Sequence, residues 1–592
     1  MKNWFNPALT LSRLLSSAAK QEFGNNTVFL PEVRPADPKF GDFQANGVLP
    51  FAKQQRTNPR VLATQLVEAL KKEPSYDPEL FKISIAGPGF INFTLTPTFL
   101  TQWLTTYDSQ EVIQAASSLL YQGQKIVVDY PSPNTAKEMH IGHLRPMIIG
   151  ESIQRLLRFC GAELVRDNHI GDWGTNFGIL IMALKASKQS LPEDDEEALV
   201  KIEALYKEGS ALTQADSSAL ERARGELIDL QQEKPESLAI WEQINAISKC
   251  AFQKIYDRLG LEFDVELGES FYRDKVHRVY EELIEAGIAE ESEGAWVVFH
   301  PGHPRFSKDA ERPQPFIVRK QDGGSNYAST DLAAVLYRSE HFGADKIIYV
   351  TDGRQRDHFE QLFLTVKRWY NEKQRPLPEL EHVWFGAILG KDGKALKTKS
   401  GDSIKLKALL DEAVDRAYAI VCEKTPELGE QEHRRIAEVI GISAVRYADL
   451  MQNRTADYIF SWDKLLNFDG NSAPYLLMAG ARIHSIFRKL GLKPGKGEDG
   501  ASSFETEAEL TLARKLLRFP FVLDQTNREL RPHYLCTFLY ELAVTFSHFY
   551  NANKVIDQTA AIQSRRLMLC ARTLCILEIG LDLLGLEPLE RM

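Results

Sequence analysis

The sequence predicts an α/β protein in which a parallel-sheet core with a helical insertion follows a small α+β domain and precedes an all-α domain. Three observations support this fold class. A short apolar strand from Lys125 leads through a proline-rich loop into a helix, two alternating strands flank Gly87-Pro-Gly89, and almost every segment after residue 408 has helical periodicity. A chain of 592 residues has room for three or four domains of about 100–200 residues each.

The composition excludes several classes of protein. Hydrophobic residues make up 44% and charged residues 26% of the chain, which excludes a wholly disordered or fibrous protein. The 71 Lys and Arg against 81 Asp and Glu give a net charge of −10. This charge does not suit a general nucleic-acid coat, because non-specific binding depends on neutralising phosphates. A local basic groove remains compatible with it.

The cysteines and the apolar segments indicate a cytoplasmic protein. The six cysteines are too few for a disulfide framework, and none forms the Cys-x-x-Cys pair typical of structural zinc. The N-terminal leucines have helical spacing and lack the continuous apolar core of a signal peptide. No run of about 18 apolar residues occurs, so we expect no membrane span.

Residues 1 to 120 are predicted to form the α+β domain. One helix presents an apolar face made of Val61, Leu62, Leu66 and Leu70. The segments that begin at Phe81 and Phe90 alternate in polarity around a Gly-Pro-Gly turn, which is typical of a β-hairpin.

Residues 121 to 407 are predicted to form the core. After Lys125, strand signals return at Trp296, Phe316, Lys346 and His382, with long helical stretches between several of them. The charge-rich segment from about 185 to 260 reads as a helical insertion. From 408 to 592 we expect the all-α domain, where one helical face consists of Leu535, Phe538, Leu542, Phe546 and Phe549.

The strongest candidate site is the segment Asp129-Tyr-Pro-Ser-Pro-Asn-Thr-Ala-Lys-Glu-Met-His-Ile-Gly-His-Leu-Arg-Pro, which ends at Pro146. A buried strand delivers Asp129 to its carboxyl end, where open α/β sheets hold their ligands. Pro146 marks the first turn of the next helix. His140 and His143 therefore lie at a helix N-terminus, which favours a polyphosphate.

The glycine and the histidines of this segment suit a nucleotide. Gly142 allows a purine to approach the backbone closely, and the two histidines can donate to phosphate oxygens that gain charge as pyrophosphate leaves. A lone His-x-Gly-His tetrapeptide is more often a pair of surface histidines in a loop. The strand before it, the helix after it and the adjacent Lys137 favour the phosphate site.

These residues resemble a known family. His140-Ile-Gly-His143 is similar to the first signature of class I aminoacyl-tRNA synthetases, and the segment from Ser132 to Arg145 resembles the arginyl-tRNA synthetases. The resemblance extends over nearly the whole chain, through Phe40-Gly-Asp-Phe-Gln-Ala-Asn, Ala86-Gly-Pro-Gly-Phe-Ile-Asn-Phe, Asn168-His-Ile-Gly-Asp-Trp-Gly, Gln355-Arg-Asp-His-Phe-Glu-Gln361 and Ala444-Val-Arg-Tyr-Ala-Asp-Leu.

The resemblance implies a Rossmann-type catalytic core, an N-terminal appended domain that contacts tRNA and a C-terminal anticodon-binding domain. The implied activity is ATP-dependent ligation of arginine to its tRNA through an arginyl-adenylate, with release of pyrophosphate and AMP. It also implies that activation of arginine requires bound tRNA. Within this family, Asp129, Tyr327 and Asp331 would bind the guanidinium, and Asn134 and Gln355 the α-amino and carboxylate groups.

Two of these residues have ordinary structural alternatives. Asp331 could instead be the N-cap of the helix that follows it, and Tyr327 could be a core residue. By resemblance, His140, Gly142 and His143 bind ATP, and His140, His143 and Lys137 are catalytic.

The loop from Gly390 to Gly401 replaces the second signature of the class. It holds four lysines and suits closure over a triphosphate. By resemblance, Lys397 and Lys399 bind ATP and Lys399 is also catalytic, although which lysine does the work is open. For Lys391 and Lys394 the alternative is a solvated basic loop.

The expected partners are arginine, its tRNA and ATP accompanied by Mg²⁺, with no zinc and no membrane, and we expect a monomer. Tyr475 and Arg482 are the candidate tRNA-binding residues, with helix packing as their alternative role. Further basic residues at the start of the all-α domain could add to a local tRNA surface: Arg446, Arg454, Arg488 and Lys489.

Two other functions share parts of this pattern. A small-molecule nucleotidyltransferase of the same superfamily would use the His-x-Gly-His logic but has no use for the long helical domain. A catalytically inactive tRNA-binding paralogue would be expected to have lost His140, His143 or Lys137, and all three are present.

Overall fold

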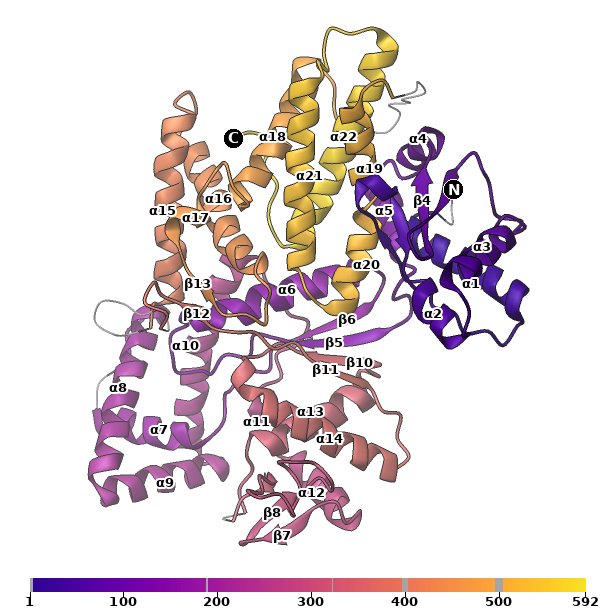
Figure 1. Cartoon of the computed structure of the whole chain (residues 1–592). Coiled ribbons are helices and arrows are strands. Elements are labelled where there is room, and N and C mark those ends of the chain that lie inside the picture. Colours follow the sequence, from indigo (N-terminus) through magenta and orange to yellow (C-terminus); the bar gives the residue numbers. More distant parts are fainter. Residues whose placement is uncertain (1–3, 188–189, 322, 395, 397–402, 496–503) are drawn as a thin grey trace. The chain divides into compact units, whose positions relative to one another are not determined.

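The computed structural model describes residues 4–592 except 188–189, 322, 395, 397–402 and 496–503. It divides into two compact units, one made of residues 1–120 and 466–592 and the other of residues 121–465 (Figure 1). The predicted fold class is confirmed, since a parallel sheet with helices, a small α+β domain and a helical C-terminal domain are all present. Among the described helices, none is long and apolar enough to cross a bilayer.

Four parallel strands form the central sheet, in the order β11-β10-β5-β6. Their bounds are β5 (Lys125–Asp129), β6 (Glu163–Asp167), β10 (Lys346–Tyr349) and β11 (Glu379–His382). The register places Tyr349 beside both Asp129 and His382, and Asp129 beside Asp167. Because these four residues end their strands, the carboxyl edge of the sheet carries a continuous row of polar side chains.

Helices cover both faces of this sheet (Figure 1). On one face α6 (Leu144–Phe159) contacts β5 and β6. On the other face lie α13 (Tyr327–His341) and α14 (Arg356–Glu372). Val127 and Ile347 from the sheet share one apolar core with these two helices. The sheet is therefore doubly wound, in agreement with the Rossmann-type core that the resemblance implies.

A second, antiparallel sheet in the same unit corrects part of the strand prediction. It contains β7 (Glu290–Ser292), β8 (Ala295–Val298) and β9 (Phe316–Arg319), next to α11 (Glu269–Tyr272) and α12 (Val276–Glu285). The strand signals at Trp296 and Phe316 therefore do not belong with the core strands, because β8 pairs with β7 and β9. The sequence analysis also missed β6.

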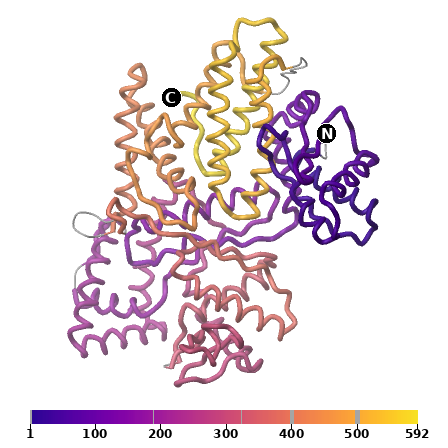
Figure 2. The backbone as a smooth tube through the Cα atoms, viewed as in Figure 1, coloured from indigo at the N-terminus to yellow at the C-terminus, as the bar shows by residue number. Residues whose placement is uncertain are grey.

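The predicted helical insertion is present but begins about ten residues earlier than expected, because α7 (Thr175–Ser187) packs with the helices of the charge-rich segment (Figure 2). These are α8 (Asp195–Ala215), α9 (Ser217–Gln231) and α10 (Pro235–Leu259). Asp194 caps α8 by accepting from the backbone N–H groups of Glu196 and Glu197. Buried Ile181, Ile202 and Ile244 join the helices in one small core.

The chain between 388 and 465 also belongs to the unit of the parallel sheet. Its elements are β12 (Ile388–Leu389), α15 (Leu406–Lys424), α16 (Glu430–Leu450), β13 (Tyr458–Ile459) and α17 (Trp462–Leu465). The sequence predicts that the all-α domain begins at residue 408, whereas α15 and α16 belong to the unit of the parallel sheet. In the structure, buried Arg145 of α6 binds buried Asp449 of α16 at 3.0 Å, which ties α16 to the sheet's own helix.

The first and last segments of the chain form the other unit. Its N-terminal part has a sheet in the order β1-β2-β4-β3. The elements are α1 (Pro7–Phe23), β1 (Val33–Pro35), β2 (Phe43–Ala45), α2 (Val48–Gln54), α3 (Pro59–Leu70), β3 (Phe81–Ala86), β4 (Phe90–Leu95), α4 (Pro97–Thr106) and α5 (Gln110–Ser117). The predicted hairpin is β3–β4. Val61, expected on the apolar face of α3, is 54% exposed.

The C-terminal part of this unit is helical. It consists of α18 (Ala473–Lys489), α19 (Glu507–Leu516), α20 (Phe519–Glu529), α21 (His533–Ala552) and α22 (Ala560–Leu583). Buried Arg572 of α22 donates to the carbonyls of Leu104 (2.9 Å) and Asp108 (2.6 Å). These hydrogen bonds join the two ends of the chain, which lie more than 450 residues apart in sequence.

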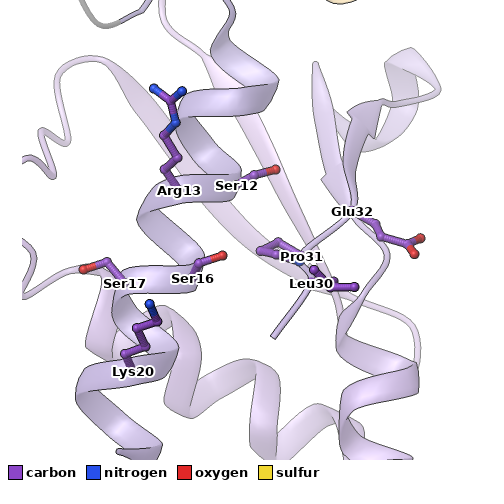
Figure 3. A pocket seen from close by; sticks show the side chains of 8 residues that line it. All are labelled: Ser12, Arg13, Ser16, Ser17, Lys20, Leu30, Pro31 and Glu32. Carbon is purple, nitrogen blue, oxygen red and sulfur yellow. The ribbon is translucent and has the colours of Figure 1, made fainter. Parts of the chain in front are cut away.

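A pocket of about 570 Å³ lies beside α1 in this unit (Figure 3). Figure 3 shows the hydroxyl groups of Ser12 and Ser16 directed toward Leu30 and Pro31. The full lining is Ser12, Arg13, Ser16, Ser17, Lys20, Leu30, Pro31 and Glu32. Two exposed cations, Arg13 and Lys20, and one carboxylate, Glu32, therefore line this cavity of the N-terminal domain together with serine side chains.

Candidate active site

A buried ion cluster occupies the carboxyl edge of the parallel sheet. Arg338 of α13 places Nη2 2.7 Å from Asp129 Oδ2 and 2.8 Å from Asp167 Oδ2. All three side chains are buried. Burial by itself lowers the pKa of Arg338, but the two aspartates outweigh it and raise that pKa above its ordinary value. A permanent positive charge therefore joins the ends of β5 and β6 to α13.

The loops that follow β5 and β6 run side by side. The Gly171 N–H donates to Pro133 O at 3.0 Å, and the Thr135 N–H donates to Gly171 O at 3.1 Å. A Cβ on Gly171 would lie 1.9 Å from Asn134 Oδ1, so this close approach requires glycine. The pairing holds Asn134, an expected ligand of the amino-acid end, exposed at the carboxyl edge of the sheet.

His140 and His143 lie at the N-terminal end of α6, as the sequence predicts, and His140 caps a short 3-10 turn (Ile141–His143) that leads into this helix. The His140 N–H donates to His143 Nδ1 at 3.1 Å, and the Gly142 N–H donates to His140 Nδ1 at 3.0 Å. Each Nδ1 is therefore an acceptor, which places the proton of each neutral ring on Nε2. Both imidazoles thus keep an N–H that can donate to an anion.

The environment keeps both rings neutral at pH 7. Burial, followed by the charges of His140 and Lys137, lowers the pKa of His143 to about 4. Burial and the charge of Lys405 also lower the pKa of His140. A Cβ on Gly142 would lie 2.8 Å from His140 Cε1. The glycine therefore allows the imidazole to fold back onto its own backbone, in addition to the expected approach of a base.

The structure describes only some of the lysines expected at the phosphate end. Lys137 is exposed, and its Nζ lies 5.3 Å from the ring centroid of Tyr206 in α8. Lys391 and Lys394 are exposed, as expected for a solvated basic loop. Lys397 and Lys399 lie outside the described residues.

Tyr327 and Asp331 lie one helical turn apart on α13 and both face His358 of α14. The His358 Nε2–Asp331 Oδ2 distance is 2.6 Å, and the Tyr327 and His358 ring centroids are 4.9 Å apart. Burial would raise the pKa of Asp331, but hydrogen bonding and charge from His358 keep it below the ordinary value. The carboxylate is therefore ionised and oriented.

The two structural alternatives for these residues are wrong. Asn326 caps α13 by accepting from the Ser329 N–H, so Asp331 is not the N-cap. The Tyr327 side chain is 64% exposed, so it is not a core residue. Gln355 is also exposed and immediately precedes α14, three residues before His358.

Several residues near this site escaped the sequence analysis. Besides Arg338, Asp167 and His358, they include Glu269 at the start of α11. Burial raises the pKa of Glu269 to about 7; the charge of His169 lowers it, and those of Asp331 and Asp172 raise it further. Asp172 in turn accepts from the Ser270 N–H and Oγ at 2.8 and 2.6 Å. The raised pKa marks Glu269 as a functional candidate, and only tertiary contacts reveal it.

The residues expected to bind tRNA lie in different environments. Tyr475 and Arg482 are half-buried on α18, where Tyr475 packs against Tyr540 (ring centroids 5.6 Å apart) and Arg482 lies 5.8 Å from the Tyr550 ring. Both therefore pack against α21. Arg488 and Lys489 are exposed.

The prediction that Arg446 and Arg454 contribute to a basic tRNA surface is wrong. Arg446 is 2% exposed and donates to Leu259 O, and Arg454 is 7% exposed and donates to Trp384 O. Both guanidinium groups are used inside the unit of the parallel sheet and cannot form a tRNA surface.

No group of three or more His, Cys, Asp or Glu side chains suited to a metal ion occurs among the described residues. The donors around the two histidines are N–H groups and lysines, which bind phosphate oxygens rather than a cation. This donor set therefore fits the phosphate end of a nucleotide.

Three protein families match successive parts of the chain. Residues 10–95 match the arginyl tRNA synthetase N-terminal domain, residues 109–462 the catalytic domain of class I (R) tRNA synthetases, and residues 476–592 the DALR anticodon-binding domain. Together these matches cover most of the chain.

Curated relatives and solved structures agree with these families. Arginine–tRNA ligases of Synechococcus sp. and Laribacter hongkongensis are both 43% identical, over 95% of this chain and 95% and 96% of theirs. The crystal structure of arginyl-tRNA synthetase from Plasmodium falciparum has a TM-score of 0.83 at 27% identity and covers 99% of both chains. The Thermus thermophilus arginyl-tRNA synthetase, at 23% identity and a TM-score of 0.81, shares the fold.

Replacing Glu269 by Gln should change the pH dependence of stability. The folded-state pKa of Glu269 is about 7, above its ordinary value of 4.5. The folded protein therefore keeps a proton that the unfolded chain releases, and raising the pH through this window costs about 3 kcal/mol of stability. Glutamine cannot ionise, so urea unfolding should show the variant gaining about that much over the parent between pH 4 and pH 8.

The exposed Glu242→Gln on α10 serves as the matched control and should show no such gain. A stability difference for Glu269→Gln that stays constant with pH would contradict the buried carboxyl.

Proposed function

Since the chain belongs to the arginyl-tRNA synthetase family and ligates arginine to its tRNA, we propose that the His140–His143 turn binds the phosphates of ATP while α13 and α14 bind arginine. The observation that carries this assignment is the tautomer of the two histidines, whose Nδ1 atoms accept backbone N–H groups and leave Nε2–H free to donate. The relatives match through the helical C-terminal domain as well, which favours the ligase over a small-molecule nucleotidyltransferase.

The reaction has two steps. The arginine carboxylate attacks the α-phosphorus of ATP, the bond to the bridging oxygen breaks, and pyrophosphate leaves. A ribose hydroxyl at the end of the tRNA then attacks the arginyl-adenylate and releases AMP. The protein supplies no nucleophile, so catalysis rests on positioning and on stabilising charge at the transferring phosphate.

At the phosphate end, His140 and His143 donate through Nε2–H and Lys137 supplies a positive charge. The start of α6 adds the N-terminal end of a helix dipole. Gly142 leaves space for the adenine to approach the backbone. Lys397 and Lys399 complete this proposal as the lysines that bind the triphosphate.

At the arginine end, Asp331 is the main acceptor for the guanidinium. It is ionised, held by His358 and partly exposed. Asp129 is buried and already accepts from Arg338 and Ser132, so it contributes through its remaining lone pairs. Tyr327 covers the guanidinium, and Asn134 and Gln355 bind the α-amino and carboxylate groups.

The tRNA contacts are assigned to both parts of the other unit. The cavity beside α1 offers Arg13, Lys20 and the hydroxyls of Ser12 and Ser16 to a sugar-phosphate backbone. In the C-terminal part, Tyr475 and Arg482 provide an aromatic face and a cation, and Arg488 and Lys489 are exposed nearby in sequence. We further propose that Mg²⁺ accompanies ATP, that no zinc is used, and that the protein works as a cytoplasmic monomer.

The direct test is exchange of pyrophosphate into ATP with each amino acid in turn, with and without tRNA. Among the amino acids, only arginine should support exchange. By the family resemblance it should also require tRNA. Exchange with a different amino acid would contradict the substrate assignment, whereas exchange without tRNA would contradict the tRNA requirement.

His143→Ala should lower the rate of arginine activation by a factor of about 10²–10³, as for loss of one donor to a developing charge. Lys137→Ala should have an effect of similar size. Thermal unfolding should change little for either variant. The exposed His277→Ala is the control and should keep full activity. Full activity of His143→Ala would contradict the proposal that His143 donates to the phosphates of ATP.

Asp331→Asn should raise the KM for arginine by about 10–100-fold, because a hydrogen bond to a charged group contributes about 1.5–3 kcal/mol. The KM for ATP should change much less. Asp357→Asn, an exposed carboxylate on α14, is the matched control. Equal changes in both KM values would show that Asp331 acts on the fold of the site rather than on arginine.

A further inference from the structure

The segment that carries His140 is paired with the chain just after the lysine loop. The Ile141 N–H donates to Ile404 O at 2.9 Å, and the Leu406 N–H donates to Met139 O at 2.9 Å. His140 and Lys405 lie opposite each other in this antiparallel pairing. The His140 segment of the proposed ATP site and residues 404–406, more than 250 residues apart in the chain, are thus joined by backbone hydrogen bonds.

Glu203, from α8 of the helical insertion, binds both of these paired segments. Its Oε2 accepts from the Glu138 N–H at 3.3 Å and from Lys405 Nζ at 3.0 Å. Lys405 Nζ also lies 2.8 Å from the Glu138 carboxylate. The other oxygen of Glu203 binds Lys207, whose side chain is 69% exposed, at 2.9 Å. One carboxylate therefore contacts both paired segments.

The Glu203 carboxylate is ionised at neutral pH. Burial would raise its pKa, but hydrogen bonds from Lys207, Lys405 and the Glu138 backbone lower it to about 2. Its side chain is 16% exposed. A partly buried charge with several donors has a defined orientation, because it loses solvation and hydrogen bonds when it moves away from them.

A second contact from the same helix reaches the same site. Tyr206 lies one turn after Glu203, and the Lys137 ammonium sits 5.3 Å from its ring centroid. The Tyr206 hydroxyl donates to Asn176 Oδ1 at 3.1 Å, which fixes the ring against α7. The insertion thus contacts the segment that carries the phosphate-binding residues at two points, one turn of α8 apart.

We propose that Glu203 is a positioning residue for ATP, which holds the His140 segment and Lys405 in register from the helical insertion. This proposal rests on the assignment of the phosphates to His140 and His143. Glu203 itself need not touch ATP. It fixes the backbone whose N–H groups set the tautomers of both histidines, so its loss should affect ATP more than arginine.

Glu203→Ala tests the proposal in pyrophosphate exchange with tRNA present. The kcat/KM for ATP should fall by about 10-fold, in line with the loss of a charged hydrogen bond. The KM for arginine should stay within about twofold, because the described partners of Glu203 are Lys207, Lys405 and the Glu138 N–H, none of which belongs to the proposed arginine end. Glu203→Gln keeps an acceptor for the Glu138 N–H but loses the charge, so it should show a smaller loss and remain informative if the alanine variant unfolds.

Lys207→Met is the matched control, since it removes the exposed partner of the same carboxylate and leaves both paired segments untouched. It should lose much less activity than Glu203→Ala, because the contacts of Glu203 with Lys405 and the Glu138 N–H remain. Lys405→Met should resemble Glu203→Ala, and the double variant should be no worse than the more affected single variant if the two act as one unit.

The outcomes separate this proposal from the site assignment. An unchanged kcat/KM for ATP, or equal losses for ATP and arginine, in both Glu203 variants overturns the positioning role. So does an equal loss in Lys207→Met. His143→Ala is measured in the same assay: if it retains full activity, the phosphate assignment fails as well, and if it loses activity, that assignment stands by itself.

Discussion

The catalytic unit depends on the buried ion pairs that Arg338 makes with two aspartates. Its guanidinium lies between Asp129 and Asp167 at the ends of two neighbouring parallel strands, with none of the three side chains open to solvent. Removal of one partner from such a buried pair typically costs about 3–5 kcal/mol, because the remaining charges are left without compensation. Arg338 therefore fixes where α13 crosses the sheet edge. Asp331 and Tyr327 lie 7 and 11 residues earlier, on the same face of that helix. Their approach to His358 follows from the same anchor.

The proposed phosphate end depends on the backbone rather than on charge. Two N–H groups select the tautomers of His140 and His143, and burial keeps both rings neutral. Neutral donors have a physical advantage next to pyrophosphate: they stabilise charge as it develops without binding the ground state as tightly as two imidazolium ions would. The permanent charges, Lys137 and Lys405, lie at the border of this turn and are held by Tyr206 and Glu203 of the insertion.

The distribution of arginines explains how a chain of net charge −10 can act on an anionic RNA. Many guanidinium groups stabilise the interior, including Arg145 with Asp449, Arg446 with Leu259 O, and Arg565 and Arg566 with buried Glu509. They are unavailable to a ligand. The exposed cations, such as Arg13 and Lys20 of the cavity beside α1, are the ones that the proposed tRNA contacts use.

The sequence alone determined the elements whose signals are local. The apolar strand ending at Asp129, the turn with His140 and His143 before α6, the helical insertion and the helical C-terminal part all follow from periodicity, capping and short motifs. The tertiary structure decided which side chains meet. Arg338 and Asp129 are 209 residues apart, and the pairs Asp331–His358 and Glu203–Lys405 join separate helices and loops. It also decided that Arg446 and Arg454 are buried and that β8 and β9 form their own sheet. A periodic pattern fixes the face on which a residue lies, but a partner, a degree of burial or a shifted pKa depends on segments that only folding brings together.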